Sequence, residues 1–96
     1  MPKIARIGDR TFGPCIACQA SVYGRIVEGA SKTSCEGPMI ARLGDEVQCD
    51  SGHSGYIDSS SPDVSAEGPL IARKGDTYSG VYSGEIIEGA SISFAN

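Results

Sequence analysis

The 96-residue sequence has no tryptophan, a single histidine and few aromatic or basic residues, and each scarcity excludes a class of protein. Lys and Arg number 8 against 12 Asp and Glu, and they are spread along the chain, which argues against binding a nucleic-acid backbone. No apolar run is long enough to span a bilayer, and the N-terminus lacks the apolar core of a signal peptide. We therefore expect a protein that is made and folded in the cytosol.

Helical periodicity is also scarce. No apolar pattern at i, i+3 and i+4 continues beyond about two turns, and the one helix-like stretch is a weak turn around residues 16–20. The 13 Gly and 5 Pro interrupt every segment. Short β-branched runs between turns predict an all-β domain, and a domain of this size often gains stability from a metal, a disulfide or a partner.

One phrase, Ile-Ala-Arg-x-Gly-Asp, is present three times, beginning at Ile4, Ile40 and Ile71. A second phrase, Ile-x-Glu-Gly-Ala-Ser, recurs at residues 26–31 and 86–91, with a looser copy at 56–61. Such spacing predicts an internal array. Because no single unit could bury a core, we expect one domain over residues 1–96, in which three units (about 3–35, 39–66 and 70–96) pack around a pseudo-threefold axis.

Each unit is predicted to run strand, turn, loop, strand, turn. Ile-Ala-Arg is a short extended run, and Gly-Asp is a turn in which glycine supplies a positive φ at low cost. The segments after Gly-Asp are predicted to be loops, at residues 10–19, around 49–53 and at 77–84. The second strands are expected over residues 21–28 and 56–58.

Two of these predicted loops carry metal-ligand spacing. Cys15-x2-Cys18 and Cys49-x3-His53 are two short chelating pairs at equivalent places in neighbouring repeats, so we expect them to meet. Three thiolates and one imidazole suit zinc, with iron as the second candidate, and four protein ligands would make the site structural.

Other interpretations of these residues stay open. The cysteines could be free buried thiols with His53 as an ordinary loop residue, or a disulfide pair in an oxidising compartment. Cys35 aligns with Ala66 of the next repeat and is interpreted as a small core residue, but it could replace His53 in an all-thiolate site. Cys49 and His53 are also close enough in sequence to form a catalytic thiol–imidazole pair, although shared coordination explains all four residues.

Each repeat also pairs an arginine with an aspartate three residues later. These residues are Arg6 and Asp9, Arg42 and Asp45, and Arg73 and Asp76. A bidentate contact within or between repeats would give them a structural role, whereas the alternative is solvated surface charge of little consequence. Because an active site needs one asymmetric set of groups, a threefold pair is not expected to be catalytic. We expect no enzyme, and we expect the four tyrosines to pack in the core or an interface.

The same residues resemble a known family. Pro2-Lys3-Ile4-Ala5-Arg6, Pro38-Met39-Ile40-Ala41-Arg42 and Pro69-Leu70-Ile71-Ala72-Arg73 look like the motif of the PAAR (proline-alanine-alanine-arginine) repeat proteins, and the resemblance covers the whole chain. It implies a small cone of short strands with a metal near its apex. The family's usual ligands are three histidines and one cysteine, so Cys15 and Cys18 would replace histidines here, and Gly80 stands where the third repeat often has a ligand.

The resemblance further implies a mechanical role. The broad base of the cone would cap the trimeric β-helical spike of a contractile injection machine, with one tip per trimer. That machine would be a type VI secretion system with a valine–glycine-repeat spike, a phage tail or a related particle, and the tip would touch the target membrane only transiently. We expect a bare tip on which a separate effector could still dock. The alternative is a free-standing zinc-binding regulatory or redox module.

Overall fold

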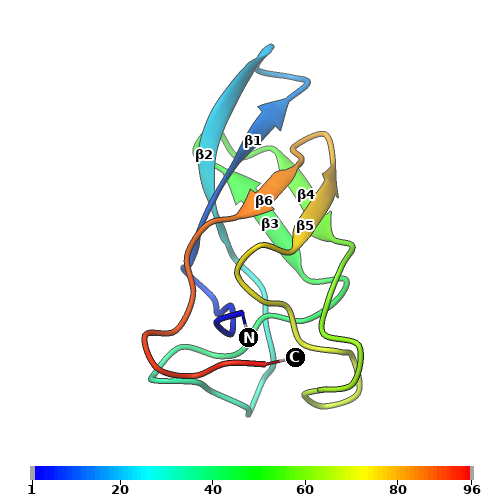
Figure 1. The fold of residues 1–96 in the computed structure, drawn as a ribbon. Helices are drawn as coiled ribbons and strands as arrows, with labels where there is room; N and C mark the ends of the chain where they lie inside the picture. Colours follow the sequence, from blue (N-terminus) through cyan, green and yellow to red (C-terminus); the bar gives the residue numbers. More distant parts are fainter. Residues whose placement is uncertain (1, 96) are drawn as a thin grey trace.

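Six antiparallel strands form three hairpins in the computed structural model, which describes residues 2–95 (Figure 1). The first hairpin joins β1 (Arg10–Cys15) to β2 (Ala20–Ile26), the second joins β3 (Glu46–Cys49) to β4 (Ser54–Ile57), and the third joins β5 (Thr77–Gly80) to β6 (Gly84–Ile86). Because β6 pairs back onto β1, the sheet closes into a barrel without free edges. The predicted all-β fold is confirmed. Within residues 2–95 there is no helix that could cross a membrane.

The loops predicted at residues 10–19 and 77–84 are wrong in their first parts, because Arg10–Cys15 is β1 and Thr77–Gly80 is β5. Residues 16–19 and 50–53 do lie between strands, in the turns of the first two hairpins. In β1 the residues alternate between exposed and buried, with Thr11 and Cys15 pointing inward. Gly13 and Pro14 were part of the predicted loop, but both lie in β1. Glycine is needed at position 13 because a Cβ there would lie 2.4 Å from the Gly84 Cα. The second strands are also displaced from the predicted 21–28 and 56–58. The helix-like stretch at 16–20 contains the turn of the first hairpin.

Below the barrel, the three Ile-Ala-Arg runs meet in a closed ring of hydrogen bonds. The Ala5 amide donates to the Ala72 carbonyl (3.0 Å), Ala41 donates to Ala5 (3.0 Å), and Ala72 donates to Ala41 (2.9 Å). All three alanines are completely buried. A small side chain is needed at these positions because three backbones converge there, which explains why alanine recurs at the centre of the motif.

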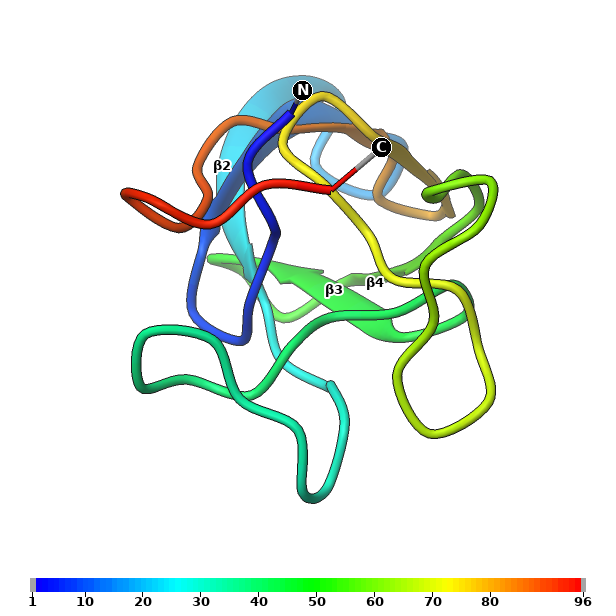
Figure 2. The ribbon, with the colours of Figure 1, turned by 60° about the horizontal axis from the view of Figure 1, so that its bottom comes forward.

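Three loops spread outward beneath this ring, as Figure 2 shows. In each loop an amide donates to a proline carbonyl, from Cys35 to Pro38, from Ala66 to Pro69 and from Ala95 to Pro2. The third contact joins the two ends of the chain, so a linear sequence completes a threefold arrangement. We call the end with these loops and both termini the base, and the end with the hairpin turns the apex (Figure 1).

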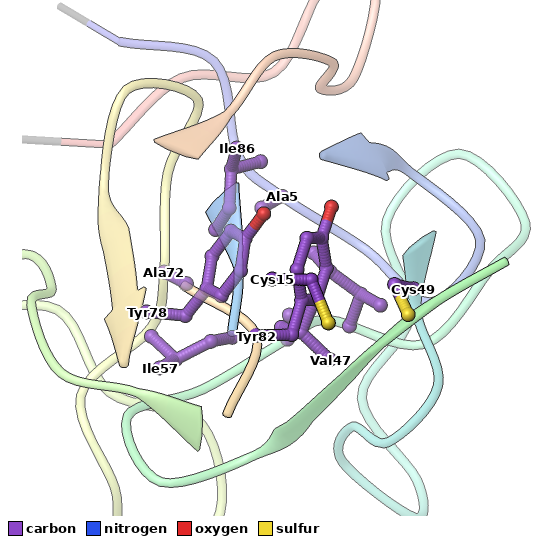
Figure 3. Close-up of a cluster of buried hydrophobic side chains, with 11 residues drawn as sticks. Ala5, Cys15, Val47, Cys49, Ile57, Ala72, Tyr78, Tyr82 and Ile86 are labelled. Carbon is purple, nitrogen blue, oxygen red and sulfur yellow. The ribbon is translucent and has the colours of Figure 1, made fainter. Parts of the chain in front are cut away.

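Two clusters of buried side chains occupy the two ends. The barrel cluster is built around Tyr78 and Tyr82, whose ring centroids are 4.9 Å apart (Figure 3). The base cluster contains Cys35 and four alanines. The other two tyrosines, Tyr23 and Tyr56, are about half exposed on the outer wall. The two tyrosine rings therefore fill the barrel, whereas the base cluster is completed by two isoleucines, Ile40 and Ile71.

Candidate metal centre

The four predicted ligands lie on the turns of the first two hairpins. Cys15 ends β1 and Cys18 lies in the turn that follows, while Cys49 ends β3 and His53 immediately precedes β4. In the first turn the Gln19 amide donates to the carbonyls of Cys15 (2.9 Å) and Ile16 (3.3 Å). In the second turn the Cys49 amide donates to the His53 carbonyl (2.9 Å) and the Gly52 amide donates to the Cys49 carbonyl (2.8 Å). These tight turns need a residue with positive φ, which is Gln19 in one and Gly52 in the other.

The four ligand atoms converge at distances that suit one ion. His53 Nδ1 lies 3.5 Å from the Sγ atoms of Cys15 and Cys18 and 3.6 Å from that of Cys49. All four ligand atoms lie within 4.8 Å of one another. A tetrahedral zinc ion with bonds of about 2.3 Å to sulfur and about 2.0–2.1 Å to nitrogen would separate N from S by roughly 3.5 Å. The residues therefore fit a tetrahedral ion held through Nδ1.

Burial and connectivity place this site inside the apex. Cys15 and Cys49 are buried, whereas Cys18 and His53 are partly exposed. Two ligands come from each of two hairpins, so an ion would tie β1–β2 to β3–β4 at the narrow end. With four protein ligands the coordination shell would be closed, which is the arrangement of structural and not catalytic sites.

Cys35 lies apart from this site. It is buried in the base cluster with Ala66 and Ala95, its counterparts in the other two repeats, as the alignment with Ala66 had predicted. The all-thiolate site that would include Cys35 and omit His53 has no support in this geometry. All four cysteines are free thiols, so no disulfide occupies the apex.

Each arginine of the repeat pairs with the aspartate of its own repeat. Arg6 Nη2 lies 3.0 Å from Asp9 Oδ1, its Nε lies 3.2 Å from Oδ2, and its backbone amide also donates to Oδ2 at 2.8 Å. The pairs Arg42–Asp45 and Arg73–Asp76 repeat this pattern. Hydrogen bonding to the carboxylate raises the pKa of each arginine. The geometry closes a turn within each repeat, away from the metal ligands.

Sequence analysis missed two glutamates that clamp the base loops. Glu67 accepts hydrogen bonds from the hydroxyls of Thr33 and Ser31 and from two backbone amides of that loop, and these contacts lower its pKa to about 2. Glu36 does the same for residues 91–93, and its pKa is also lowered. Both glutamates have φ near +55°, which is uncommon for a residue with a Cβ. The repeated Glu-Gly-Pro turn was the available signal.

Comparison with known proteins supports the family that the repeated motif resembles. The sequence model described as the PAAR motif matches residues 16–81, which is more than half of the chain. A search of curated proteins gave no match. The match includes Cys18, Cys49 and His53, with Cys15 just before its first residue, and it spans the second and third copies of the Ile-Ala-Arg phrase. This chain belongs to the PAAR-motif family.

Proposed function

We propose that this chain is the tip of a contractile injection machine, seated by its base on a trimeric β-helical spike. The PAAR motif is known from such spike-tip proteins. The observation that carries the proposal is the base, where one chain presents three equivalent loops around the alanine ring (Figure 2). A threefold base on a single chain matches the end of a trimer at a ratio of one to three.

The exposed end of a β-helical spike has a chemical reason to be capped. Its last strands leave unpaired backbone groups, which attract other strands. The base of this chain is built from loops whose outer surface includes exposed apolar side chains, with Ile92 79 % and Phe94 48 % exposed. Such side chains would lose contact with water on docking, and the barrel above them has no free edge to attract further strands.

For the apex we propose zinc held by Cys15, Cys18, Cys49 and His53, with iron as the second candidate. Zinc bound there would cross-link the two hairpins as a structural ion. Cys15 and Cys49 belong to the barrel cluster, so ligand bonds would add to the packing there and hold the turns that extend beyond it. The same ligand set leaves His53 no role as a catalytic base, and we propose that the chain is not an enzyme.

A further part of the proposal concerns the machine that carries the tip and the place where the tip acts. The machine would be a type VI secretion system, a phage tail or a related particle. The chain would be made and assembled in the cytosol, and would then cross the target envelope at the front of the spike. Contact with the membrane would be transient, and a separate effector could travel on the tip.

A pull-down with a trimeric β-helical spike protein tests this proposal. Phe94→Asp places a charge on the base and is expected to weaken capture at least tenfold. Tyr56→Asp is the matched control, because Tyr56 is an aromatic residue of similar exposure (52 %) on the barrel wall. Equal loss in both variants, or no capture of the unmodified chain, would contradict docking through the base. Rapid thiol–disulfide turnover by a chain that ignores every spike would instead support the redox-module alternative.

A further inference from the structure

The third hairpin stands where a third ligand pair would be expected, but it carries glycines. Gly80 ends β5 as Cys49 ends β3, and Gly84 begins β6 where His53 precedes β4. Both glycines have φ values that side chains rarely adopt, 143° and 148°. The third turn therefore differs from the other two in backbone as well as in chemistry, and residues 80–84 have no role in the ligand set.

The turn of this hairpin is inserted between the two hairpins that carry the ligands. The Ile16 amide donates to the Val81 carbonyl (2.9 Å), and the Ser83 amide donates to the Pro14 carbonyl (3.0 Å). On the other side, the Tyr82 amide donates to the Ser54 carbonyl (3.1 Å). Pro14 and Ile16 flank Cys15, and Ser54 follows His53. Three main-chain hydrogen bonds thus join residues adjacent to ligands in both chelating pairs.

The side chain of Tyr82 strengthens the same connection. Its hydroxyl lies 2.9 Å from Thr11 Oγ1 on β1 and donates to the Val22 carbonyl on β2 at 3.2 Å. Its fully buried ring packs against Gly24, where a Cβ would lie 2.7 Å from the ring. Gly24 is paired with Cys49. Figure 3 shows the Tyr82 ring beside Cys15, which ends β1, and shows Cys49, which ends β3.

Glycines allow the third hairpin to approach this closely. A Cβ on Gly84 would lie 2.3 Å from the Phe12 carbonyl oxygen, and one on Gly55 would lie 2.0 Å from the Tyr82 carbonyl oxygen. No side chain fits at either distance. The first and second hairpins therefore contact the third through backbone atoms, which fixes their separation more firmly than flexible side chains would.

We infer that residues 80–84, with Tyr82 at their centre, form a positioning element that brings the two chelating pairs together before a metal ion binds. This inference rests on the proposed metal centre. An ion that enters a preformed site does not have to order two mobile turns, so the affinity is higher than the ligands alone would give. Groups that orient ligands in this way commonly change metal affinity by about 10–100-fold when they are removed.

Paired tyrosine variants test the inference. Tyr82→Phe removes the hydroxyl bonded to Thr11 and Val22, and is expected to weaken zinc binding roughly fivefold, the equivalent of about one hydrogen bond. Tyr78→Phe is the control, because the buried Tyr78 hydroxyl has no hydrogen-bond partner among the described residues. Zinc affinity is measured by competition with a chromophoric chelator. Equal affinities of the two variants would overturn the inference.

A backbone variant applies a stronger perturbation. Gly84→Ala forces β6 away from Phe12 and is expected to weaken zinc binding more than tenfold. Gly75→Ala strains another positive-φ glycine (φ 96°) of the same repeat, where a Cβ meets nothing within 4 Å. It should lower the melting temperature of the metal-free and zinc-loaded chain alike and leave the zinc affinity unchanged. Equal affinity losses in both variants would show general destabilisation and contradict positioning.

Amide hydrogen exchange of the metal-free chain separates this inference from the metal proposal. Ile16, Tyr82 and Ser83 donate the three connecting hydrogen bonds, so their amides should be protected without zinc. Protection that appears only after zinc is added would overturn the inference and leave the metal centre standing. If the unmodified chain binds no zinc, the proposed metal centre and the positioning inference are both overturned. If it binds zinc and the variants bind equally well, only the positioning role falls.

Discussion

The apex and the base of this molecule differ in how far they keep the threefold symmetry of the repeat. Towards the base, the same main-chain contacts recur in all three repeats: each loop has an amide that donates to a proline carbonyl, and the alanine ring is closed by hydrogen bonds that differ by 0.1 Å. At the apex, two hairpins carry ligands, and the third carries glycines and a buried tyrosine. Symmetry is thus retained at one end and lost at the other.

Geometry explains the difference. Three backbones that meet on an axis impose the same restriction on each repeat, so the same alanine recurs. A tetrahedral ion requires four ligands, a number that three identical repeats cannot supply equally. In the proposed site two repeats would therefore give two ligands each, and the third is free to pack between them. A threefold partner would contact the base, where the symmetry is intact.

Removal of one proposed metal ligand is expected to have the largest effect on the apex. Cys49→Ser is expected to abolish stoichiometric metal binding and, at free zinc near 1,000 times the dissociation constant, to remove about 4 kcal/mol of stability. Elemental analysis and thermal unfolding measure the two effects. Cys35→Ala is the control, because alanine occupies the equivalent positions of the other repeats, and it should keep full metal content. Unchanged metal content in Cys49→Ser would contradict the ligand assignment.

Removing one carboxylate of the repeat tests the structure shared by the three units. Asp45 is 7 % exposed in its side chain and accepts two bonds from Arg42 together with a backbone amide. Asp45→Ala leaves the partly buried Arg42 guanidinium with only the Gly29 carbonyl as a partner among the described residues, which is expected to reduce the free energy of unfolding by about 2 kcal/mol. Urea denaturation measures the loss. Glu85→Ala, at an exposed position, should change stability little, and equal effects would assign the Arg–Asp pairs to solvated surface charge.

Enlarging the alanine ring probes the axis of the base. Ala41→Val adds two methyl groups where three backbones converge, and overpacking of this kind costs about 1–3 kcal/mol. Ala20→Val at the exposed start of β2 is the matched control and should be nearly neutral. A variant at Ala41 as stable as the Ala20 variant would show that the axis has room for larger side chains.

The smallest expected effect comes from the clamps between base loops. Hydrogen bonds from the loop at residues 31–33 lower the pKa of Glu67 from 4.5 to about 2. Its contribution to stability is therefore complete above about pH 4.5 and is lost as the pH falls towards 2. Glu67→Gln should lower the melting temperature at pH 6 but not near pH 2, whereas Glu85→Gln should change it at neither. A pH-independent difference for Glu67→Gln would contradict the clamp.

Local patterns in the sequence predicted the all-β cone and the set of four residues that the structure brings together. The spacing of Cys15 and Cys18, and of Cys49 and His53, is a property of short turns and needs no knowledge of the rest of the fold. The ring of Ala5, Ala41 and Ala72 was implied by the repeat, although its hydrogen bonds were not. These features depend on contacts within a few residues or on repetition itself.

Contacts between distant segments could not be predicted. Arg10–Cys15 and Thr77–Gly80 were assigned to loops because their glycines suggest turns in isolation, whereas Gly13 allows close contact between β1 and Gly84. Tyr82 was assigned to core or interface packing, but its connection to both ligand hairpins depends on how the third repeat folds over the first two. The clamp by Glu67 likewise joins loops that are far apart in sequence.

Native mass spectrometry of this chain mixed with a trimeric β-helical spike tests the central claim most directly. The account predicts one complex whose mass equals three spike chains, one copy of this chain and one metal ion. The ion should be lost in Cys49→Ser. Absence of a complex, a complex with three copies of this chain, or a one-to-three complex without bound metal would contradict the account.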